Sequence, residues 1–348
     1  MSPVLRLDSI SKSFEANKVL KGVGLTVDAG EIHGLVGENG SGKTTLLNIL
    51  TGHPVIRHTG GYSGRVLLDG QPAEIRSPGE AIAAGLGMVH QEFALLPGLT
   101  VAENITFGRE KARALSLIDR AADRAEAAAS LQRLGVKLDP DIKAGGLSVN
   151  LAQYVEIARE IGRRALRVLI VDEPTATMGD EDSARLLPVL QELAGQGTAI
   201  IFVSHRLEEV LSICTRITVL RDGEVVDRLA RGEQDYSLER IARAMVGREI
   251  VETKRSARTV PDRGLARFED FGVDMPGEAI RDLNLELRQG EILGVAGLSG
   301  HGKLAIGYGL MGWHPTRGMG RMNGRPMKAE GPRGAISQGV FLLPDDRR

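Results

Sequence analysis

The chain has 348 residues, which favours two domains because one ordinary hydrophobic core serves about 100–200 residues. Its 44 Lys and Arg residues nearly balance its 45 Asp and Glu residues, so the formal net charge is −1. Proteins that bind nucleic acid usually carry a basic excess, and this composition argues against that class. The single cysteine, Cys214, cannot form an internal disulfide, which is typical of a reducing compartment.

The sequence contains neither a secretory signal nor a membrane-spanning pattern. Residues 1–8 lack the basic stretch and apolar segment that open such a signal. The longest apolar runs, such as 168–171 and 199–203, have strand length and fall far short of the roughly 20 residues of a spanning helix. We therefore expect a cytosolic protein, which would reach a membrane by docking onto another subunit.

The chain repeats itself at an offset of 260 residues. Gly30-Glu31-Ile32 recurs as Gly290-Glu291-Ile292, and Lys43 corresponds to Lys303. We predict two copies of one domain, at 1–250 and 265–348, joined by an exposed polar linker at 251–264. The second copy is much shorter than the first, so we expect it to be incomplete.

A phosphate-binding loop stands at 37–44, where the sequence matches G-x-x-x-x-G-K-[ST]. An apolar strand is predicted before it at 32–36 and a helix after it at 45–50. The glycines allow backbone N–H groups to turn toward phosphate oxygens at the positive end of that helix. A glycine-rich turn that contains lysine by chance is a weak alternative for a full match in this context. The residues predicted to bind nucleotide here are Gly37, Glu38, Asn39, Gly40, Ser41, Gly42, Lys43, Thr44 and Thr45.

The sequence also predicts a Mg²⁺ site and a water-orienting residue near this loop. We expect Lys43 to contact the β- and γ-phosphates and the Thr44 hydroxyl to bind Mg²⁺. The apolar run at 168–171 ends in Asp172 and Glu173, as a buried parallel strand with acids at its carboxyl end would. Asp172 would bind Mg²⁺, and Glu173 would orient and polarise the attacking water. Two acids after a strand are a weak signal alone, but the phosphate loop upstream favours the catalytic interpretation.

These motifs, in this order, resemble the nucleotide-binding domains of ABC transporters. The resemblance is closest to the duplicated ATP-binding subunits of bacterial carbohydrate importers of the ribose, xylose and galactose type, over residues 4–348. The segments that carry it are Gly37-Glu38-Asn39-Gly40, His90-Gln91-Glu92, Glu103-Asn104-Ile105, Leu147-Ser148, Val155-Glu156-Ile157-Ala158, Asp172-Glu173-Pro174-Thr175 and Ser204-His205-Arg206.

The resemblance implies roles for three more residues. Gln91 corresponds to a glutamine that senses the γ-phosphate and Mg²⁺ beside the transmembrane subunit. His205 corresponds to the switch histidine, which contacts the γ-phosphate and helps to hold the hydrolytic water. Phe14 corresponds loosely to an aromatic residue that stacks on adenine. Taken alone, each has an ordinary alternative: a solvated loop glutamine, a surface histidine and a strand aromatic.

The resemblance also implies a fold. We expect an α/β fold, the P-loop NTPase fold of ABC type, in which a mainly parallel sheet is flanked by helices. An α-helical subdomain is expected at about 115–165, with helices at 121–134 and 155–161. The second copy would begin the same fold again.

Three motifs depart from the family pattern. The signature Leu-Ser-Gly-Gly-Gln is replaced by Leu147-Ser148-Val149-Asn150-Leu151, and Leu304 replaces the Mg²⁺-binding hydroxyl of the second phosphate loop. Asp345 stands where the second copy should have its sensing glutamine. ABC domains bind ATP between two copies, each pairing its loop with the signature of the other. The altered signature and the altered second phosphate loop would face each other, so we expect that composite site to be impaired. The site of the first loop would need an intact signature from the second copy, which this sequence does not include, so we expect slow hydrolysis by this chain alone.

The leading functional hypothesis is an ATP hydrolase that binds ATP and Mg²⁺ and energises carbohydrate import. It would act on the cytoplasmic face of the inner membrane as a peripheral subunit. Its partners would be transmembrane permease subunits and, indirectly, a periplasmic solute-binding protein, with no nucleic acid. Two alternatives stay open: a soluble ABC ATPase acting on nucleic acid or ribosomes, and a catalytically silent, truncated regulatory form.

Overall fold

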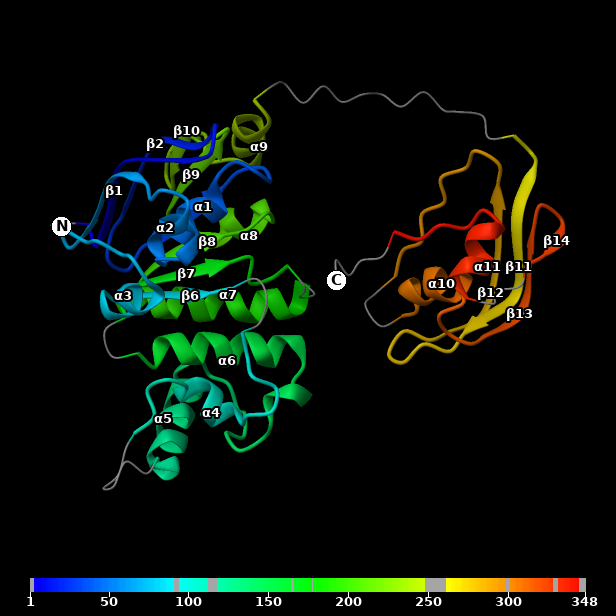
Figure 1. Ribbon diagram of the computed structural model, residues 1–348, viewed down its shortest axis with the longest axis horizontal. Coiled ribbons are helices and arrows are strands. Elements are labelled where there is room, and N and C mark those ends of the chain that lie inside the picture. The colour runs from blue at the N-terminus through cyan, green and yellow to red at the C-terminus, as the bar shows by residue number, and fades with distance from the viewer. Residues whose placement is uncertain are drawn as a thin grey trace. The chain divides into compact units, whose positions relative to one another are not determined.

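The computed structural model describes residues 3–90, 94–111, 118–163, 166–176, 178, 180–247, 261–297, 301–327 and 331–343. The chain divides into two compact units, Met1–Val251 and Glu252–Arg348, which we describe separately (Figure 1). Most of the predicted linker lies outside the described residues. Gly264, its last residue, begins a strand.

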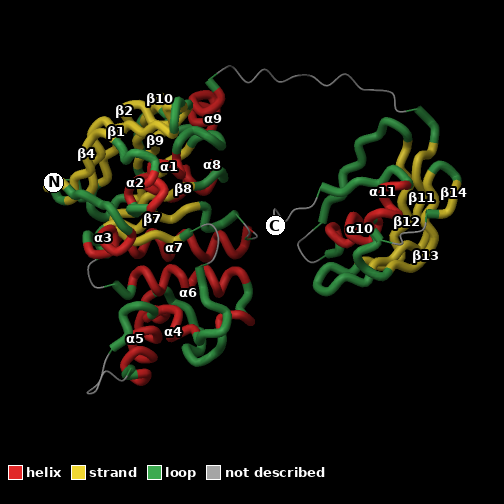
Figure 2. The backbone as a smooth tube through the Cα atoms, in the orientation of Figure 1, coloured by secondary structure: helices red, strands yellow, loops and turns green. Residues whose placement is uncertain are grey.

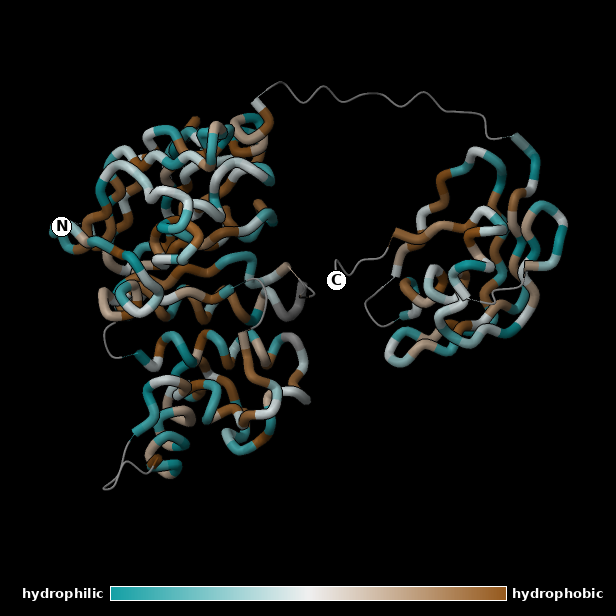
Figure 3. Tube along the Cα trace, viewed as in Figure 1, coloured by the Kyte–Doolittle hydropathy of each residue, from teal (hydrophilic) through white to brown (hydrophobic). Residues whose placement is uncertain are grey.

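A six-stranded sheet forms the centre of the first unit. Its strands run in the order β10 (Glu224–Ala230), β9 (Arg216–Arg221), β3 (Ile32–Val36), β8 (Ala199–Val203), β7 (Val168–Asp172) and β6 (Leu86–Val89). All neighbours pair parallel except β9 and β10. Strands β3 and β8 are buried along their whole length, which requires continuous apolar runs rather than alternation. Figure 3 accordingly colours β7 as hydrophobic. The mainly parallel α/β sheet is confirmed.

A second sheet of the first unit is antiparallel. It runs in the order β2 (Asn17–Val27), β1 (Leu5–Phe14), β4 (Ser63–Leu68) and β5 (Gln71–Pro72). Its inward residues, including Leu5, Leu7 and Ile10, share a core with α1. This core fixes the antiparallel sheet beside the phosphate loop.

Helices flank the two sheets (Figure 2). They are α1 (Lys43–Leu50), α2 (Pro54–His58), α3 (Pro78–Ala83), α7 (Asp180–Gly195), α8 (Leu207–Ile213) and α9 (Leu238–Val246). Helix α1 begins two residues before the predicted start at 45, because Gly42 is left-handed with φ 105° and forms its N-cap. None of the helices in the described ranges is long and apolar enough to cross a membrane.

A helical layer covers one side of the first unit. It contains α4 (Val101–Thr106), α5 (Arg120–Arg133) and α6 (Val149–Ile161). Figure 1 places α6 between α7 and the pair α4 and α5. The predicted helices at 121–134 and 155–161 are confirmed, but α6 starts earlier because Ser148 caps it. Helix α4 lies before the expected limit of 115, since a Thr100–Glu103 capping box starts a helix there; residues 115 and 165 lie outside the described residues.

An ionic cluster around the buried residues Glu31 and His33 joins the start of β3 to β9. Glu31 accepts hydrogen bonds from His33 Nδ1 at 2.9 Å and from Arg216 Nε at 2.7 Å, and Arg216 also contacts Asp28. Burial alone would raise the pKa of Glu31, but the bonds from His33, Arg216 and the Asp28 backbone lower it to about 2. Thr218 Oγ1 lies 2.8 Å from His33 Nε2. The cluster ties segments that lie 185 residues apart in the chain.

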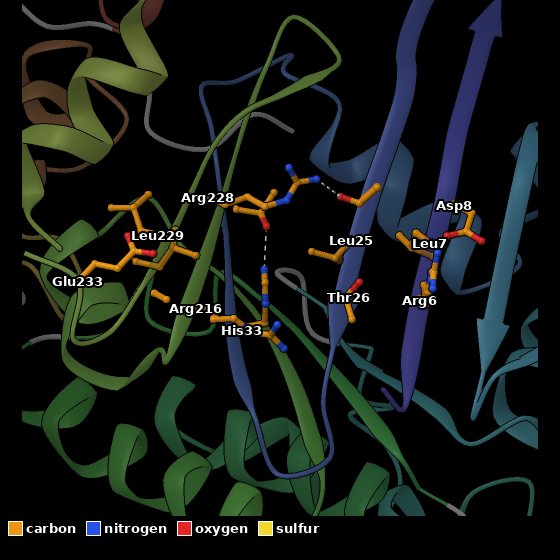
Figure 4. A pocket seen from close by; sticks show the side chains of 14 residues that line it. Arg6, Leu7, Asp8, Leu25, Thr26, His33, Arg216, Arg228, Leu229 and Glu233 are labelled. Carbon is orange, nitrogen blue, oxygen red and sulfur yellow. Dashed lines mark hydrogen bonds and ion pairs between the residues drawn. The ribbon is translucent and has the colours of Figure 1, made fainter. Parts of the chain in front are cut away.

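A cavity of about 430 Å³ lies beside this cluster, between the two sheets of the first unit (Figure 4). Its arginines are engaged with protein groups. Arg6 pairs with Asp8 at 2.7 Å, and Arg228 donates to the Gly24 carbonyl at 3.0 Å. The residues that line the cavity include none of the phosphate loop.

The only cysteine of the sequence, Cys214, is fully buried just after α8. Its carbonyl oxygen accepts a hydrogen bond from Tyr236 at 2.7 Å. Burial raises the pKa of the thiol far above its usual range.

The second unit repeats the antiparallel part of the first. Its sheet order is β12 (Ile280–Arg288), β11 (Gly264–Val273), β13 (Thr316–Met322) and β14 (Arg325–Pro326), with helices α10 (Lys303–Leu310) and α11 (Pro332–Ser337). In its described residues no parallel sheet is present. Ile292, the counterpart of Ile32, is 98% exposed, whereas Ile32 is 4% exposed.

Candidate nucleotide-binding site

The phosphate loop at 37–44 connects β3 to α1 and depends on two close approaches of its backbone. A Cβ atom at Gly37 would lie 2.2 Å from the carbonyl oxygen of Leu220, and one at Gly42 would lie 2.7 Å from Leu20 Cδ2. Any side chain at either position would displace the loop. Glu38, Asn39 and Gly40 form its exposed turn.

The turn between β9 and β10 forms hydrogen bonds that hold the phosphate loop in place. Gly223 N–H donates to the Ser41 carbonyl at 3.1 Å, and the Gly223 carbonyl accepts from Lys21 N–H at 2.9 Å. Ser41 Oγ is buried and has no hydrogen-bond partner among the described residues. A buried hydroxyl without a partner indicates that the loop is built to receive a polar ligand. Gly223 could not be predicted from the sequence, because no local pattern connects it with residues 37–44.

Lys43 opens α1 and turns back over the loop. Its ammonium donates to the carbonyl oxygens of Gly37 at 2.6 Å and Glu38 at 3.0 Å. Burial lowers the pKa of Lys43, and the charges of Glu173 and Asp172 partly offset this effect. The two predicted motifs, at 37–44 and 172–173, therefore lie close enough for their charges to interact. Thr44 is exposed beside Lys43, and Thr45 is half-buried in the same turn.

Asp172 ends β7, and Glu173 follows it with an unusual backbone. Burial and the neighbouring Glu173 raise the pKa of Asp172 to about 6, against the lowering effect of Lys43. A bound cation beside Asp172 would remove this penalty, which suits the predicted Mg²⁺ ligand. Glu173 has a φ of 49° while its N–H donates to the Val203 carbonyl at 2.8 Å. A positive φ at a residue other than glycine stores backbone strain, and such strain is concentrated at functional sites.

His205 lies two residues beyond the end of the adjacent strand, β8. Its Nδ1 is 3.3 Å from Glu173 Oε2, and its side chain is 60% exposed. The parallel pairing of β7 with β8 places the two strand ends side by side, with Asp172 opposite Val203. The structure thus brings together the predicted water-orienting carboxylate and the predicted switch histidine.

A hydrogen-bond network that the sequence did not predict fixes the segments that follow β7 and β8. The buried Thr175 donates to Glu209 Oε2 at 2.5 Å, and Arg206 donates to Glu209 Oε1 at 3.0 Å. Arg206 also donates to the Met178 carbonyl at 3.2 Å. The loop after Glu173 is therefore tied to α8. Glu209 lies four residues after His205, but its partner Thr175 could not be found from the sequence.

Phe14 is half-buried at the end of β1, against the core shared with α1. The ammonium of Lys12 lies 4.7 Å from its ring centroid and donates to the Thr59 carbonyl at 2.7 Å. This cation–π contact orients the ring. Adenine stacking on Phe14 stays a prediction.

Two other predicted motifs are placed only in part. Gln91 lies outside the described residues, which resume at Ala94. Ser148 is exposed and caps α6 by accepting from Leu151 N–H at 3.5 Å.

The second phosphate loop has one hydrogen bond in common with the first and one that the first lacks. Lys303 donates to the Gly297 carbonyl, as Lys43 does to Gly37. Glu278, at the position that corresponds to Lys18, accepts from Gly302 N–H at 2.8 Å. Leu304 occupies the place of Thr44. A backbone N–H group of this loop thus already donates its hydrogen bond to a carboxylate of the same chain.

Comparisons with known proteins agree with this geometry. Residues 20–176 match the family model described as ABC transporter. Ribose import ATP-binding protein RbsA 1 of Rubrobacter xylanophilus is 42% identical over 349 residues, which cover 100% of this chain and 67% of that protein. Ribose import ATP-binding protein RbsA of Chromobacterium violaceum is 42% identical over 97% of this chain and 66% of its own length. The chain thus spans about two thirds of these relatives.

Solved structures show the same fold. The ADP conformation of MJ1267, an ATP-binding cassette of an ABC transporter, superposes with a TM-score of 0.61 at 25% identity and covers 71% of this chain and 100% of its own. The dimeric ABC transporter cassette MJ0796 gives a TM-score of 0.55 at 25% identity, over 66% of this chain and all of its own. The chain therefore belongs to the ABC transporter family, among its ATP-binding subunits.

Proposed function

We propose that the first unit binds MgATP and hydrolyses it to energise the import of a sugar through an ABC transporter. The observation that carries this proposal is the convergence of three strand ends. The phosphate loop follows β3, Asp172 ends β7 and is followed by Glu173, and His205 follows β8. These are neighbouring parallel strands, and ligands of open α/β sheets bind at the carboxyl ends of such strands.

We assign a role to each of these residues. Lys43 and the N–H groups of the loop bind the phosphates, and Ser41 Oγ is a further donor without a partner in the described structure. Thr44 and Asp172 would hold Mg²⁺, with Gln91 as a third ligand. Mg²⁺ would neutralise charge on the phosphates. Glu173 orients the attacking water, and His205 holds Glu173 and the γ-phosphate in register.

The transport function is supported by the relatives, which are named ribose import ATP-binding proteins. We infer that transmembrane permease subunits are the direct partners, and that a periplasmic solute-binding protein acts through them. The chain would then be peripheral on the cytoplasmic face of the membrane. His90 and Ala94, which stand on either side of Gln91 in the sequence, line a small cavity of about 230 Å³ together with residues that include His53 and Ile82.

A nucleotide titration tests the proposal with a control inside the same chain. Lys43→Ala should abolish binding of a fluorescent ATP analogue, whereas Lys303→Ala in the second loop should leave it unchanged. Glu173→Gln should keep binding and lose hydrolysis. Equal affinity in the Lys43→Ala variant and the native chain would reject the assignment of the site.

A further inference from the structure

The inward face of β1 carries a lysine where the strand otherwise presents apolar side chains. Leu5, Leu7 and Ile10 are buried in the core shared with α1. Lys12 and Phe14 follow Ile10 at every second position, so they lie on the same face of the strand. Lys12 is only 2% exposed. Lysine is among the residues least often buried, and its burial here indicates that specific contacts hold it.

The ammonium of Lys12 lies between the end of α2 and the ring of Phe14. It donates to the carbonyl oxygens of Thr59 at 2.7 Å and Ile56 at 3.4 Å. It is 4.7 Å from the centroid of the Phe14 ring, within the range of a cation–π interaction. In the ranges that the structure describes, no carboxylate pairs with Lys12. The partners of this charge are therefore two carbonyl groups and an aromatic face.

A link between β1 and α2 does not by itself require a positive charge. Burying an ammonium without a carboxylate costs free energy, and a methionine would fill the same space with an apolar chain. Thr59 is exposed, and carbonyl groups at the end of a helix can be satisfied by water. What the charge of Lys12 adds is its contact with the ring of Phe14.

Phe14 stands on a hairpin that packs directly against the phosphate loop. It ends β1 and pairs with Asn17 at the start of β2. Further along β2, Leu20 is so close to the loop that a Cβ atom at Gly42 would lie 2.7 Å from its Cδ2. Phe14 is also the only Phe, Tyr or Trp between residues 1 and 61 of the sequence. The hairpin therefore offers one aromatic ring to a base bound beside this loop.

A ring that stacks on a base needs a fixed plane and an accessible face. The ammonium of Lys12 lies over the Phe14 ring, which is only half-buried. Aromatic rings are negative over their faces, which disfavours direct face-to-face contact with a second π system. A cation over one face offsets this negative charge, and so favours a base on the other face.

We propose that Lys12 is a positioning residue for the base of the nucleotide: it holds the Phe14 ring from one face, so that the other face can stack on adenine. The inference rests on the proposed function, because it takes MgATP to bind at the phosphate loop of the first unit. It adds to the stacking predicted for Phe14 a residue that acts through the ring and does not touch the nucleotide.

Two ligands that share the phosphates but not the base test this role. Lys12→Met should weaken binding of MgATP roughly three- to tenfold, because part of the stacking is lost, and should leave binding of magnesium tripolyphosphate unchanged. Arg6→Met is the matched control, since it removes an exposed cation of the same strand that pairs with Asp8. Calorimetric titration of the full chain gives both affinities. Equal losses for the two ligands, or no loss, would overturn the proposal.

Two further substitutions separate the charge of Lys12 from its link to α2. Lys12→Gln keeps an N–H donor for the Thr59 carbonyl but has no charge, so it should fold and still lose the same part of the MgATP affinity. Lys12→Arg keeps a cation that can lie over the ring, and it should restore most of that affinity. Native MgATP affinity in Lys12→Gln would assign Lys12 to the link alone and contradict the proposal.

A double variant asks whether Lys12 acts through the ring. Phe14→Leu should weaken MgATP and spare magnesium tripolyphosphate, and adding Lys12→Met should cause no further loss. Additive losses would show that Lys12 acts independently of Phe14 and would reject the inference.

The inference and the proposed function fail in different ways. A native chain that bound no MgATP would reject both together. A native chain that bound MgATP, with unchanged affinity in Phe14→Leu, would reject the stacking and this inference and leave the proposed function standing.

Discussion

Glu173 Oε2 lies 3.3 Å from His205 Nδ1, although 32 positions separate the two residues in the sequence. The contact exists because β7 and β8 are parallel neighbours and end at the same edge of the sheet. Glu173 also has its backbone held at φ 49° by this arrangement. The carboxylate is therefore positioned by the fold before any substrate arrives.

The first prediction concerns this pair. His205→Ala should lower the rate of ATP hydrolysis on the order of 10²-fold, because a preorganised contact to the reacting phosphate is lost. MgATP affinity should change little, since Lys43 and Asp172 are untouched. The measurement is single-turnover phosphate release, with His58→Ala as the control because His58 is exposed on α2. Equal rates in the two variants would remove His205 from the mechanism.

A second prediction concerns the network below the site. Glu209→Ala leaves the buried hydroxyl of Thr175 without its acceptor and should lower the free energy of unfolding by about 1–3 kcal/mol. Glu208→Ala is the matched control, because Glu208 is the exposed neighbour and should change stability by less than about 0.5 kcal/mol. Denaturant unfolding of both variants gives the comparison. Identical unfolding midpoints would show that the bond is not formed in solution.

The third prediction is an acid sensitivity caused by Glu31. Its folded-state pKa of about 2 lies below the usual 4.5, so the cluster stabilises the protein fully above pH 4.5 and loses this contribution as the pH falls toward 2. The contribution should be on the order of 2–3 kcal/mol. Glu31→Gln should therefore be less stable than the native chain at pH 7, and the difference should shrink below pH 4.

The control for this experiment is Glu224→Gln, because Glu224 forms only an exposed pair with Lys21 at 3.5 Å. Unfolding free energies measured from pH 7 to pH 2.5 should change in parallel for the control and the native chain. A constant difference between Glu31→Gln and the native chain across this range would contradict the assigned pKa.

The fourth prediction concerns the second phosphate loop, where the carboxylate of Glu278 binds the Gly302 N–H. In a Lys43→Ala background, which removes the first loop from consideration, we expect no measurable binding of pyrophosphate. Adding Glu278→Lys, which installs the residue found at the corresponding position 18, should create binding because the N–H is freed and a positive charge is gained. Glu291→Ala is the control, since Glu291 bonds to the backbone of Arg288 instead. Calorimetric titration that showed no gain in the Glu278→Lys variant would refute the competition.

Local patterns were sufficient to predict the central parts of the fold. The apolar runs at 32–36 and 199–203 are buried on both faces, so their sequence alone indicates parallel strands. The phosphate loop was recognisable because its glycines, lysine and hydroxyl residue form a pattern that lies within eight consecutive residues. The helix at 101–106 was missed because a six-residue segment shows too little periodicity, and only its capping box marks it.

What could not be predicted depends on distant partners. The support of Ser41 by Gly223 and the bond of Glu31 to Arg216 join positions more than 180 residues apart, and no local signal connects them. Glu156 was noticed only as part of a family-like segment. Its function as a bond acceptor for Ala94 becomes visible only when α6 is packed against residues 94–96.

The burial of Cys214 has a practical consequence for experiments that follow conformational change with a dye or spin label. Since the sequence contains one thiol and that thiol is shielded and hard to ionise, a maleimide reagent should leave the folded native chain unlabelled. A cysteine introduced on the surface would then be the sole attachment point for a dye or spin label, with no need to remove a native residue first. The chain is in this sense already prepared for single-site spectroscopy.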